Sequence, residues 1–138
     1  MDALRGAALV TDRRTIRRLV GVYHANGTFW GELAYVIRSR FGGTHCSLCD
    51  ITHGRVRVKE EWKSARAELP IPFDTVHLDE RVPELIALTE GRTPCVVAVT
   101  DDLPVILLGP DELAECDGSP SRLMQAVRAA ADARNLAY

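Results

Sequence analysis

The sequence has no strong excess of charge of either sign and no apolar run long enough to span a membrane. It contains 17 Lys and Arg residues against 19 Asp and Glu residues, for a formal net charge of −2. This balance argues against general nucleic-acid binding, which calls for a continuous basic surface. No apolar run approaches the roughly 20 residues that a membrane-spanning helix needs. We therefore expect neither a nucleic-acid partner nor a membrane partner.

The sequence also shows no pattern typical of an export signal or of a second domain. Residues 1–10 contain an acid, an arginine and only short apolar runs, so they lack the sustained apolar core of a secretory signal. The expected location is the cytoplasm, where thiols stay reduced and disulfides are not expected. The chain has 138 residues, 46% of them hydrophobic and 26% charged, without internal repeats or low-complexity tracts. These values suit one compact domain.

Basic residues are concentrated at the start of the chain, whereas the remainder is acidic. We predict a basic N-terminal arm or short helix over residues 1–14, followed by a single domain over residues 15–138. The arm is either a solvated surface or a binding site for an anionic partner. The arginines that crowd the first eighteen positions are Arg5, Arg13, Arg14, Arg17 and Arg18.

Cysteine and histidine are scarce, with four of each in the chain, and half of both fall within nine residues. Residues 45–53 read His-Cys-Ser-Leu-Cys-Asp-Ile-Thr-His. Gly42, Gly43 and Gly54 bracket this segment, which predicts a Cys/His loop over residues 42–55 that can fold tightly. A zinc ribbon would need two Cys-x-x-Cys pairs, and this chain has one. The pattern leaves several interpretations open.

The first interpretation is a small intracellular metal-binding protein or metalloenzyme. Cys46 and Cys49 would supply two thiolates and His53 an imidazole, a ligand set that suits a soft or borderline transition metal. Zinc is the first expectation for the cofactor, followed by copper or iron. His45 or Asp50 would complete or support the ligand set. Sequence alone does not count ligands, so an open catalytic position is neither predicted nor excluded.

The second interpretation is a thiol-disulfide oxidoreductase or redox sensor with Cys46 and Cys49 as the catalytic pair. One thiolate would attack and the other would resolve, and a nearby imidazole would supply positive charge that favours the thiolate. The third is a non-catalytic interaction module, in which the loop is a stabilising clip and the basic arm binds a partner. Ordinary buried thiols beside solvated histidines are the plainest alternative. The substrate, whether small molecule or protein, stays unnamed.

Hydrophobic periodicity predicts alternating strands and helices. Strands are expected over residues 15–25, 73–78, 95–99 and 105–108, and helices over 30–41, 59–69 and 82–88. Asp101 and Asp102 mark a tight turn, so the last two strands should form an antiparallel hairpin. Ser121 is expected to cap a final helix over residues 121–136. Cys95 should enter the core, whereas Cys116 lies near a Gly-Ser-Pro break and is expected at the surface.

This element order resembles the thioredoxin-like fold, most specifically in Thr93-Pro94 just before a buried strand and in the closing amphipathic helix. The resemblance covers most of the chain from Thr15 onward. It implies an α/β domain with about four strands in a mixed sheet flanked by helices. It also implies that Pro94 is a cis proline beside the active-site dithiol. That family carries its dithiol directly after the first strand, whereas the pair here is expected in an insertion after the first helix.

In that fold the first two strands are parallel neighbours, which would bring two further histidines to one edge of the sheet. Ligands gather at the carboxyl edge of open α/β sheets. If the Cys/His loop folds over this edge, Cys46, Cys49 and His53 would form a four-ligand set with one additional imidazole. His24 shares a face with apolar residues, so a semi-buried, hydrogen-bonded histidine is the alternative there. The candidates for the fourth ligand are His24, His45 and His77.

Overall fold

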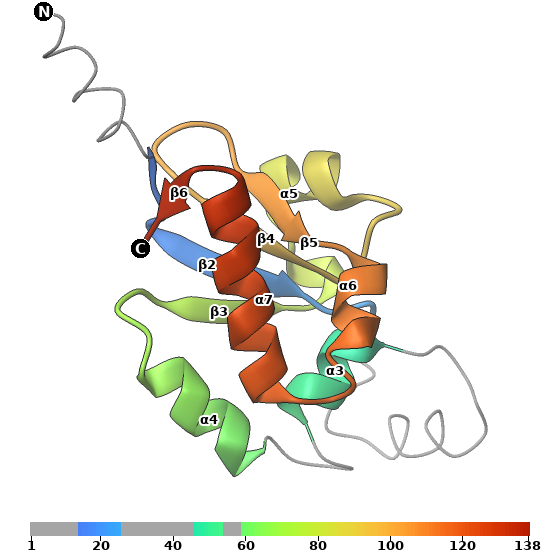
Figure 1. Cartoon of the computed structure of the whole chain (residues 1–138). Helices are drawn as coiled ribbons and strands as arrows, with labels where there is room; N and C mark the ends of the chain where they lie inside the picture. Colours follow the sequence, from blue (N-terminus) through green and yellow to red (C-terminus); the bar gives the residue numbers. More distant parts are fainter. Residues whose placement is uncertain (1–13, 26–45, 54–58) are drawn as a thin grey trace, which may run out of the picture.

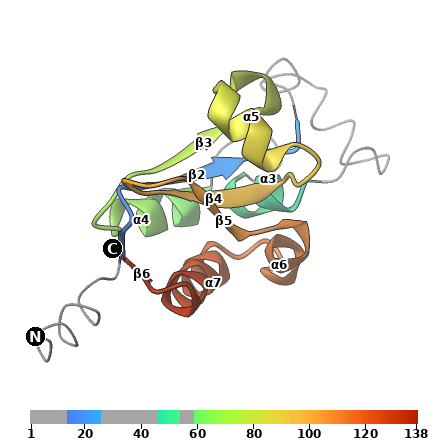
Figure 2. The same ribbon diagram turned by 90° about the horizontal axis from the view of Figure 1, so that it is seen from above.

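The computed structural model describes residues 14–25, 46–53 and 59–138. These residues form an α/β arrangement in which helices cover both faces of a four-stranded mixed sheet (Figures 1 and 2). The strands are β2 (Arg18–Val22), β3 (Phe73–Val76), β4 (Cys95–Val99) and β5 (Val105–Leu108). Their order across the sheet is β3-β2-β4-β5. The predicted α/β class with about four strands is therefore confirmed.

The pairing of the strands follows the sequence prediction. β2 and β3 are parallel, with Leu19 opposite Phe73 and Val22 opposite Val76. β4 runs antiparallel to β2, and the predicted hairpin of β4 with β5 is also antiparallel. The parallel pair brings the ends of β2 and β3 to one edge, where the Leu78 N–H donates to the Ala25 carbonyl at 2.9 Å.

Each face of the sheet carries its own apolar cluster because side chains alternate along a strand. Leu19 packs with buried residues of the helices α3, α4, α6 and α7, whereas Val20 faces the opposite cluster beneath α5. The two faces are seen edge-on in Figure 2. The helices are α3 (Ser47–Thr52), α4 (Glu60–Ala67), α5 (Pro83–Thr89), α6 (Pro110–Glu115) and α7 (Pro120–Ala133).

Two helices fall close to their predicted positions, and the final one differs at both ends. α4 and α5 lie within or near the expected ranges 59–69 and 82–88. α7 is capped by Ser119, whose hydroxyl accepts from the Arg122 N–H at 3.2 Å, rather than by Ser121. Pro120 then occupies the first helical position, where its missing N–H costs nothing. The expected helix over 30–41 lies outside the described residues.

The C-terminal end of α7 differs because the chain enters a second, two-stranded sheet. Asn135 adopts a left-handed backbone with φ of 58°, which ends the helix. The next residues form β6 (Leu136–Ala137), which pairs in parallel with β1 (Arg14–Thr15). Strands of two residues carry too little periodicity to be recognised in sequence. The expected basic arm lies outside the described residues, apart from Arg14.

The described helices differ from membrane-spanning segments in both length and composition. None of those within residues 14–25, 46–53 and 59–138 is long and apolar enough to cross a bilayer.

Candidate functional site

The Cys-x-x-Cys segment lies at the start of helix α3. The start of this helix is close in space to the end of strand β2. The expectation of a loop here is wrong, because Ser47–Thr52 is helical and Cys46 is its N-cap. The Cys46 sulfur accepts from the Cys49 N–H, as an oxygen does in an ordinary cap. Leu48 and Ile51 are both fully buried on the core side. Their burial stabilises a helix too short to form on its own.

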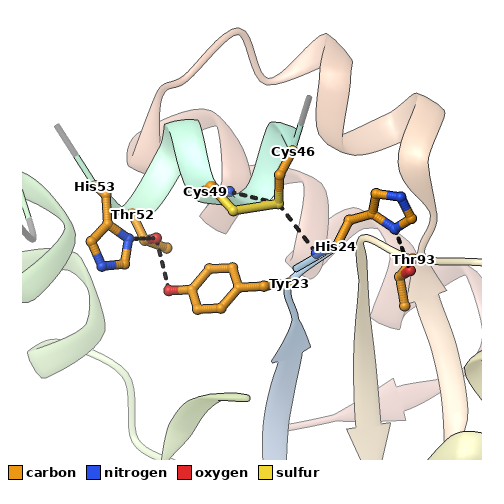
Figure 3. The surroundings of a disulfide bond; sticks show 7 residues. All are labelled: Tyr23, His24, Cys46, Cys49, Thr52, His53 and Thr93. Carbon is orange, nitrogen blue, oxygen red and sulfur yellow. Dashed lines mark hydrogen bonds between the residues drawn. A yellow bond between two sulfur atoms is a disulfide. The ribbon is translucent and has the colours of Figure 1, made fainter. Parts of the chain in front are cut away.

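Cys46 and Cys49 form a disulfide bond, with their Cα atoms 5.2 Å apart (Figure 3). The expectation that the cysteines are not disulfide-bonded is therefore wrong for this pair. Positions three apart lie on one face of a helix, so the spacing permits the bond. The solvent-exposed fraction is 4% for Cys46 and 0% for Cys49. Cys46 is thus the less buried residue of the pair.

Two backbone N–H groups point at the sulfur of Cys46. The His24 N–H, at the end of β2, donates to Cys46 Sγ at 3.3 Å, and the Cys49 N–H does so at the same distance (Figure 3). Hydrogen bonds to the charged form of a thiol favour the thiolate. Within the described residues no comparable donor reaches Cys49 Sγ. The site is therefore asymmetric, with its anion-stabilising groups directed at Cys46.

The side chain of His24 points away from the sulfur, toward the loop before β4. Its Nδ1 forms a 2.8 Å hydrogen bond with Thr93 Oγ1, as Figure 3 shows. The Thr93-Pro94 peptide bond is cis, as the resemblance predicted. Since Cys95 pairs with Val22 in the sheet, Pro94 lies beside the end of β2. His24 therefore contacts two parts of the site. Its backbone N–H contacts the Cys46 sulfur, and its imidazole contacts the Thr93-Pro94 loop.

His53 lies at the opposite end of α3 from Cys46. It is the C-cap of the helix, and its Nδ1 forms a 2.7 Å hydrogen bond with Thr52 Oγ1. Thr52 Oγ1 in turn lies 2.9 Å from the Tyr23 hydroxyl. Burial, and secondly the charge of His77, lower the pKa of His53 from 6.5 to about 4. His53 is therefore neutral at pH 7 and does not supply the positive charge that the redox interpretation expects from a nearby imidazole.

The expected metal ligands are not brought to one point by the described residues. Cys46 and His53 occupy the two caps of α3, so their Cα atoms are about 10 Å apart at 1.5 Å per residue. Among residues 14–25, 46–53 and 59–138, no group of three or more His, Cys, Asp or Glu side chains is arranged to hold a metal. Asp50 lies on a neighbouring face of α3, toward α6. His45 lies outside the described residues.

His24 and His77 do follow neighbouring parallel strands, as expected, but their side chains are separated by the alternation of β2. His77 packs against the Tyr23 ring, with the centroids 5.1 Å apart, and its Nδ1 lies 2.9 Å from Glu80 Oε1. The His24 ring instead faces Thr93. Adjacent residues of an extended chain point to opposite sides, so the two imidazoles take different sides of this edge.

No protein-family model, no curated protein and no solved structure matches this chain. The geometry of the site is therefore the basis for assigning a function.

The remaining two cysteines are buried thiols away from the pair. Cys95 is fully buried, as predicted, and burial raises the pKa of its thiol to about 11. Cys116 is 3% exposed, so the prediction of a surface position is wrong. It caps the C-terminal end of α6, and its thiol donates to the Glu112 carbonyl at 3.5 Å. Burial also raises the pKa of Cys116. In both thiols burial therefore favours the protonated form, which is the less nucleophilic one.

Sequence reasoning missed the groups that contact the cysteine pair through the backbone or across the fold. Thr93 drew notice only as the residue before Pro94, and its hydroxyl is the partner of His24. Tyr23 falls in an expected strand and Thr52 in the expected Cys/His loop, and nothing in those patterns indicates the buried hydrogen bond that they share. A backbone N–H such as that of His24 leaves no signal in a sequence, because every residue except proline has one.

Proposed function

We propose that this protein is a thiol-disulfide oxidoreductase that uses Cys46 and Cys49 as its dithiol. The observation that supports this most directly is the asymmetric disulfide, in which two backbone N–H groups reach Cys46 Sγ. Cys46 is the attacking residue, because these donors favour its thiolate and because it is the less buried residue of the pair. Cys49 resolves the intermediate from within the core.

The proposed reaction conserves atoms and electrons without a further cofactor. The Cys46 thiolate attacks one sulfur of a substrate disulfide, whose S–S bond breaks, and the released thiolate takes a proton from water. Cys49 loses its proton to water and attacks Cys46 Sγ. The Cys46–Cys49 disulfide forms and the second substrate thiolate leaves. Two electrons pass from the dithiol to the substrate, and the reverse sequence oxidises a substrate dithiol.

The arrangement of the sheet supports a thioredoxin-like assignment as part of this proposal. A parallel β2–β3 pair lies next to an antiparallel β4–β5 hairpin, and α5 lies opposite the other described helices. Cys46 begins a helix near the end of β2, and cis-Pro94 follows Thr93 beside it. These features resemble that family. The chain differs from that family in the distance between the strand and the dithiol. β2 ends at position 22 and the helix cap is at position 46, so 23 residues separate Val22 from Cys46.

A disulfide in the expected cytoplasmic location would be transient, as in catalytic and sensing proteins. The test is reduction of a disulfide substrate by the pre-reduced protein, followed by mass spectrometry of the thiols. Cys46→Ser should abolish the reaction, and Cys49→Ser should accumulate the mixed disulfide on Cys46. Cys95→Ser is the matched control, since it removes a buried thiol outside the pair. Reaction at the wild-type rate in Cys46→Ser would overturn the proposal.

Metal binding is the second candidate, favoured by the same observation that two sulfur atoms lie together at the start of α3. In this reading reduced Cys46 and Cys49 hold a soft or borderline ion, zinc first, and the remaining ligands include His45. Elemental analysis of protein purified in the presence of reductant separates the candidates. About one metal per chain, lost in both Cys46→Ser and Cys49→Ser, would favour a metal site over dithiol exchange.

A further inference from the structure

The end of strand β2 contacts both ends of helix α3 through two adjacent residues. The Tyr23 hydroxyl lies 2.9 Å from Thr52 Oγ1, on the last residue of the helix. The His24 N–H donates to Cys46 Sγ, at the N-cap. Figure 3 shows the Tyr23 ring beneath α3 and the two hydrogen bonds at opposite ends of the helix. Because Cys46 and Thr52 are six positions apart, the two points of attachment are about 9 Å apart along the helix.

Helix α3 depends on tertiary contacts for its position. It has six residues and is too short to be stable on its own. Its apolar contacts include Leu48, whose Cδ2 lies close to Gly21 of β2. Apolar burial is not directional, whereas a hydrogen bond weakens steeply when its donor and acceptor lose alignment. The two hydrogen bonds to the end of β2 therefore fix how α3 is rotated and placed over the strand.

The hydrogen bond between Tyr23 and Thr52 is shielded from water. Tyr23 is 2% exposed and Thr52 is fully buried. Breaking this bond without water to replace it leaves buried polar groups that cost free energy. Thr52 Oγ1 also lies 2.7 Å from His53 Nδ1, but both residues belong to the same end of α3. That second bond does not attach the helix to the strand, whereas the bond to the Tyr23 hydroxyl does.

We propose that Tyr23 and Thr52 are positioning residues whose hydrogen bond keeps Cys46 Sγ within reach of the His24 N–H. The inference rests on the proposed oxidoreductase function, because its consequence is the rate at which Cys46 attacks a substrate disulfide. When the bond between the two hydroxyls is lost, α3 pivots about its remaining contacts. The His24 N–H and Cys46 Sγ then lose alignment, and the thiolate of Cys46 is less stabilised. Attack on the substrate slows at neutral pH, because less Cys46 is present as thiolate.

The test measures the alkylation of each cysteine by iodoacetamide in the reduced full-length protein, at about pH 6.5, where mostly protonated thiols limit the rate. Tyr23→Phe and Thr52→Val nearly keep the shapes of the side chains and remove the hydroxyls. Each should lower the alkylation rate of Cys46 about two- to tenfold, as expected when a hydrogen bond to a charged group is weakened. Above about pH 10, where the thiol is ionised, the rate should no longer be lower than that of the wild type.

A conservative variant and a double variant show whether the hydroxyl contact itself is responsible. Thr52→Ser keeps the hydroxyl and should react at the wild-type rate at the lower pH. The double variant of Tyr23→Phe and Thr52→Val should react about as slowly as either single variant, because both changes break the same bond. A Thr52→Ser rate as low as that of Thr52→Val, or multiplying effects in the double variant, would overturn the proposal.

Two matched controls remove hydroxyls at the opposite end of the sheet. Thr100 is buried and its hydroxyl accepts from the Asp102 N–H at 3.0 Å, beyond the end of β4 that pairs with Arg18. Tyr138 follows β6, near the start of β2 (Figure 1). Thr100→Val and Tyr138→Phe should leave the alkylation rate of Cys46 unchanged. A fall in either control as large as in Tyr23→Phe would overturn the proposal.

The other two cysteines distinguish repositioning from loss of stability in the same samples. Cys95 and Cys116 are buried, so a general loosening of the fold should make both react faster. Under the proposal their alkylation rates stay at the wild-type values while the rate of Cys46 falls. An unchanged or higher Cys46 rate in Tyr23→Phe and Thr52→Val would overturn the positioning role. Faster alkylation of Cys95 and Cys116 in these variants would also overturn it, since the bond would then stabilise the fold as a whole.

Exchange with bis(2-hydroxyethyl) disulfide separates this inference from the proposed function. The exchange rate of the reduced protein should fall in Tyr23→Phe by the same factor as the alkylation rate of Cys46. No exchange by the wild type would overturn the oxidoreductase, whereas the alkylation rates would still decide whether Tyr23 positions Cys46. Exchange that is equally fast in the wild type and in Tyr23→Phe would keep the oxidoreductase and overturn the positioning role.

Discussion

The backbone N–H of His24 donates to the sulfur of Cys46 at 3.3 Å, across 22 positions of the sequence. This contact joins the end of a central strand to the cap of the helix that carries the Cys46–Cys49 pair. It makes one sulfur of the pair electrostatically different from the other. The difference can be measured in the reduced protein.

Alkylation of the reduced protein should modify Cys46 first and at lower pH than an ordinary thiol. Because two N–H groups stabilise its thiolate, the pH of half-maximal alkylation rate should lie below about 8.5, the value of a free cysteine. Mass spectrometry of iodoacetamide-treated samples across pH 5–10 would follow each cysteine separately. Equal profiles for Cys46 and Cys49 would contradict the asymmetry.

Removing the imidazole of His24 should weaken this asymmetry through the position of its backbone. The ring is hydrogen-bonded to Thr93 Oγ1, so His24→Phe and Thr93→Val each release the end of β2 from the Thr93-Pro94 loop. Both variants should shift the alkylation profile of Cys46 to higher pH. His24→Asn, which keeps a side-chain donor, is the matched control and should shift it less. A profile unchanged in both variants would show that the hydrogen bond does not position His24.

Acid should destabilise the fold through His53. Its pKa is about 4 in the folded protein and about 6.5 when unfolded, so the unfolded chain binds more protons between these values. The stabilising contribution is complete above about pH 6.5 and is lost as the pH falls toward 4. The loss should be on the order of 1–2 kcal/mol, reduced from the full linkage value because the ring is partly exposed. Urea unfolding of His53→Gln should show a shallower pH dependence over this range, and parallel curves would contradict it.

Gly21 should be sensitive to the smallest substitution, although it lies in a regular strand. A Cβ at this position would lie 3.0 Å from Leu48 Cδ2 and 3.4 Å from Phe73 Cε1. Gly21→Ala should therefore press on α3 and lower the free energy of unfolding by about 1–3 kcal/mol. The double variant with Leu48→Val should lose less than the sum of the single losses, as expected for side chains in contact. If chemical denaturation shows additive losses in the free energy of unfolding, the contact between position 21 and Leu48 is not the source of the strain.

Most of the sheet could be predicted because its signals are local. β4 and β5 alternate or run apolar over four or five residues and are joined by an Asp-Asp turn, so their hairpin follows from propensity and spacing. The neighbouring two-residue strands β1 and β6 could not be predicted. Their pairing depends on two segments that lie far apart in the sequence meeting in space, which short segments do not encode.

The candidate site was predictable in its residues and not in its geometry. The spacing of Cys46 and Cys49 identifies a pair that can bond, and it does so whether the segment is a loop or a helix. The glycines around it favoured a loop, whereas burial of Leu48 and Ile51 stabilises α3 instead. Once the segment is helical, His53 is carried about 10 Å from Cys46. Tertiary packing thus separated residues that adjacency in sequence had grouped together.

The sequence by itself determined the α/β class, the hairpin and the position of the cysteine pair, because hydrophobic periodicity and residue spacing are properties of the local chain. Only the tertiary structure decided which sulfur receives the His24 N–H, and which side chain meets the imidazole of His24. Those contacts join the end of β2 to α3 and to the Thr93-Pro94 loop. They depend on long-range packing, which brings together residues that are far apart along the chain.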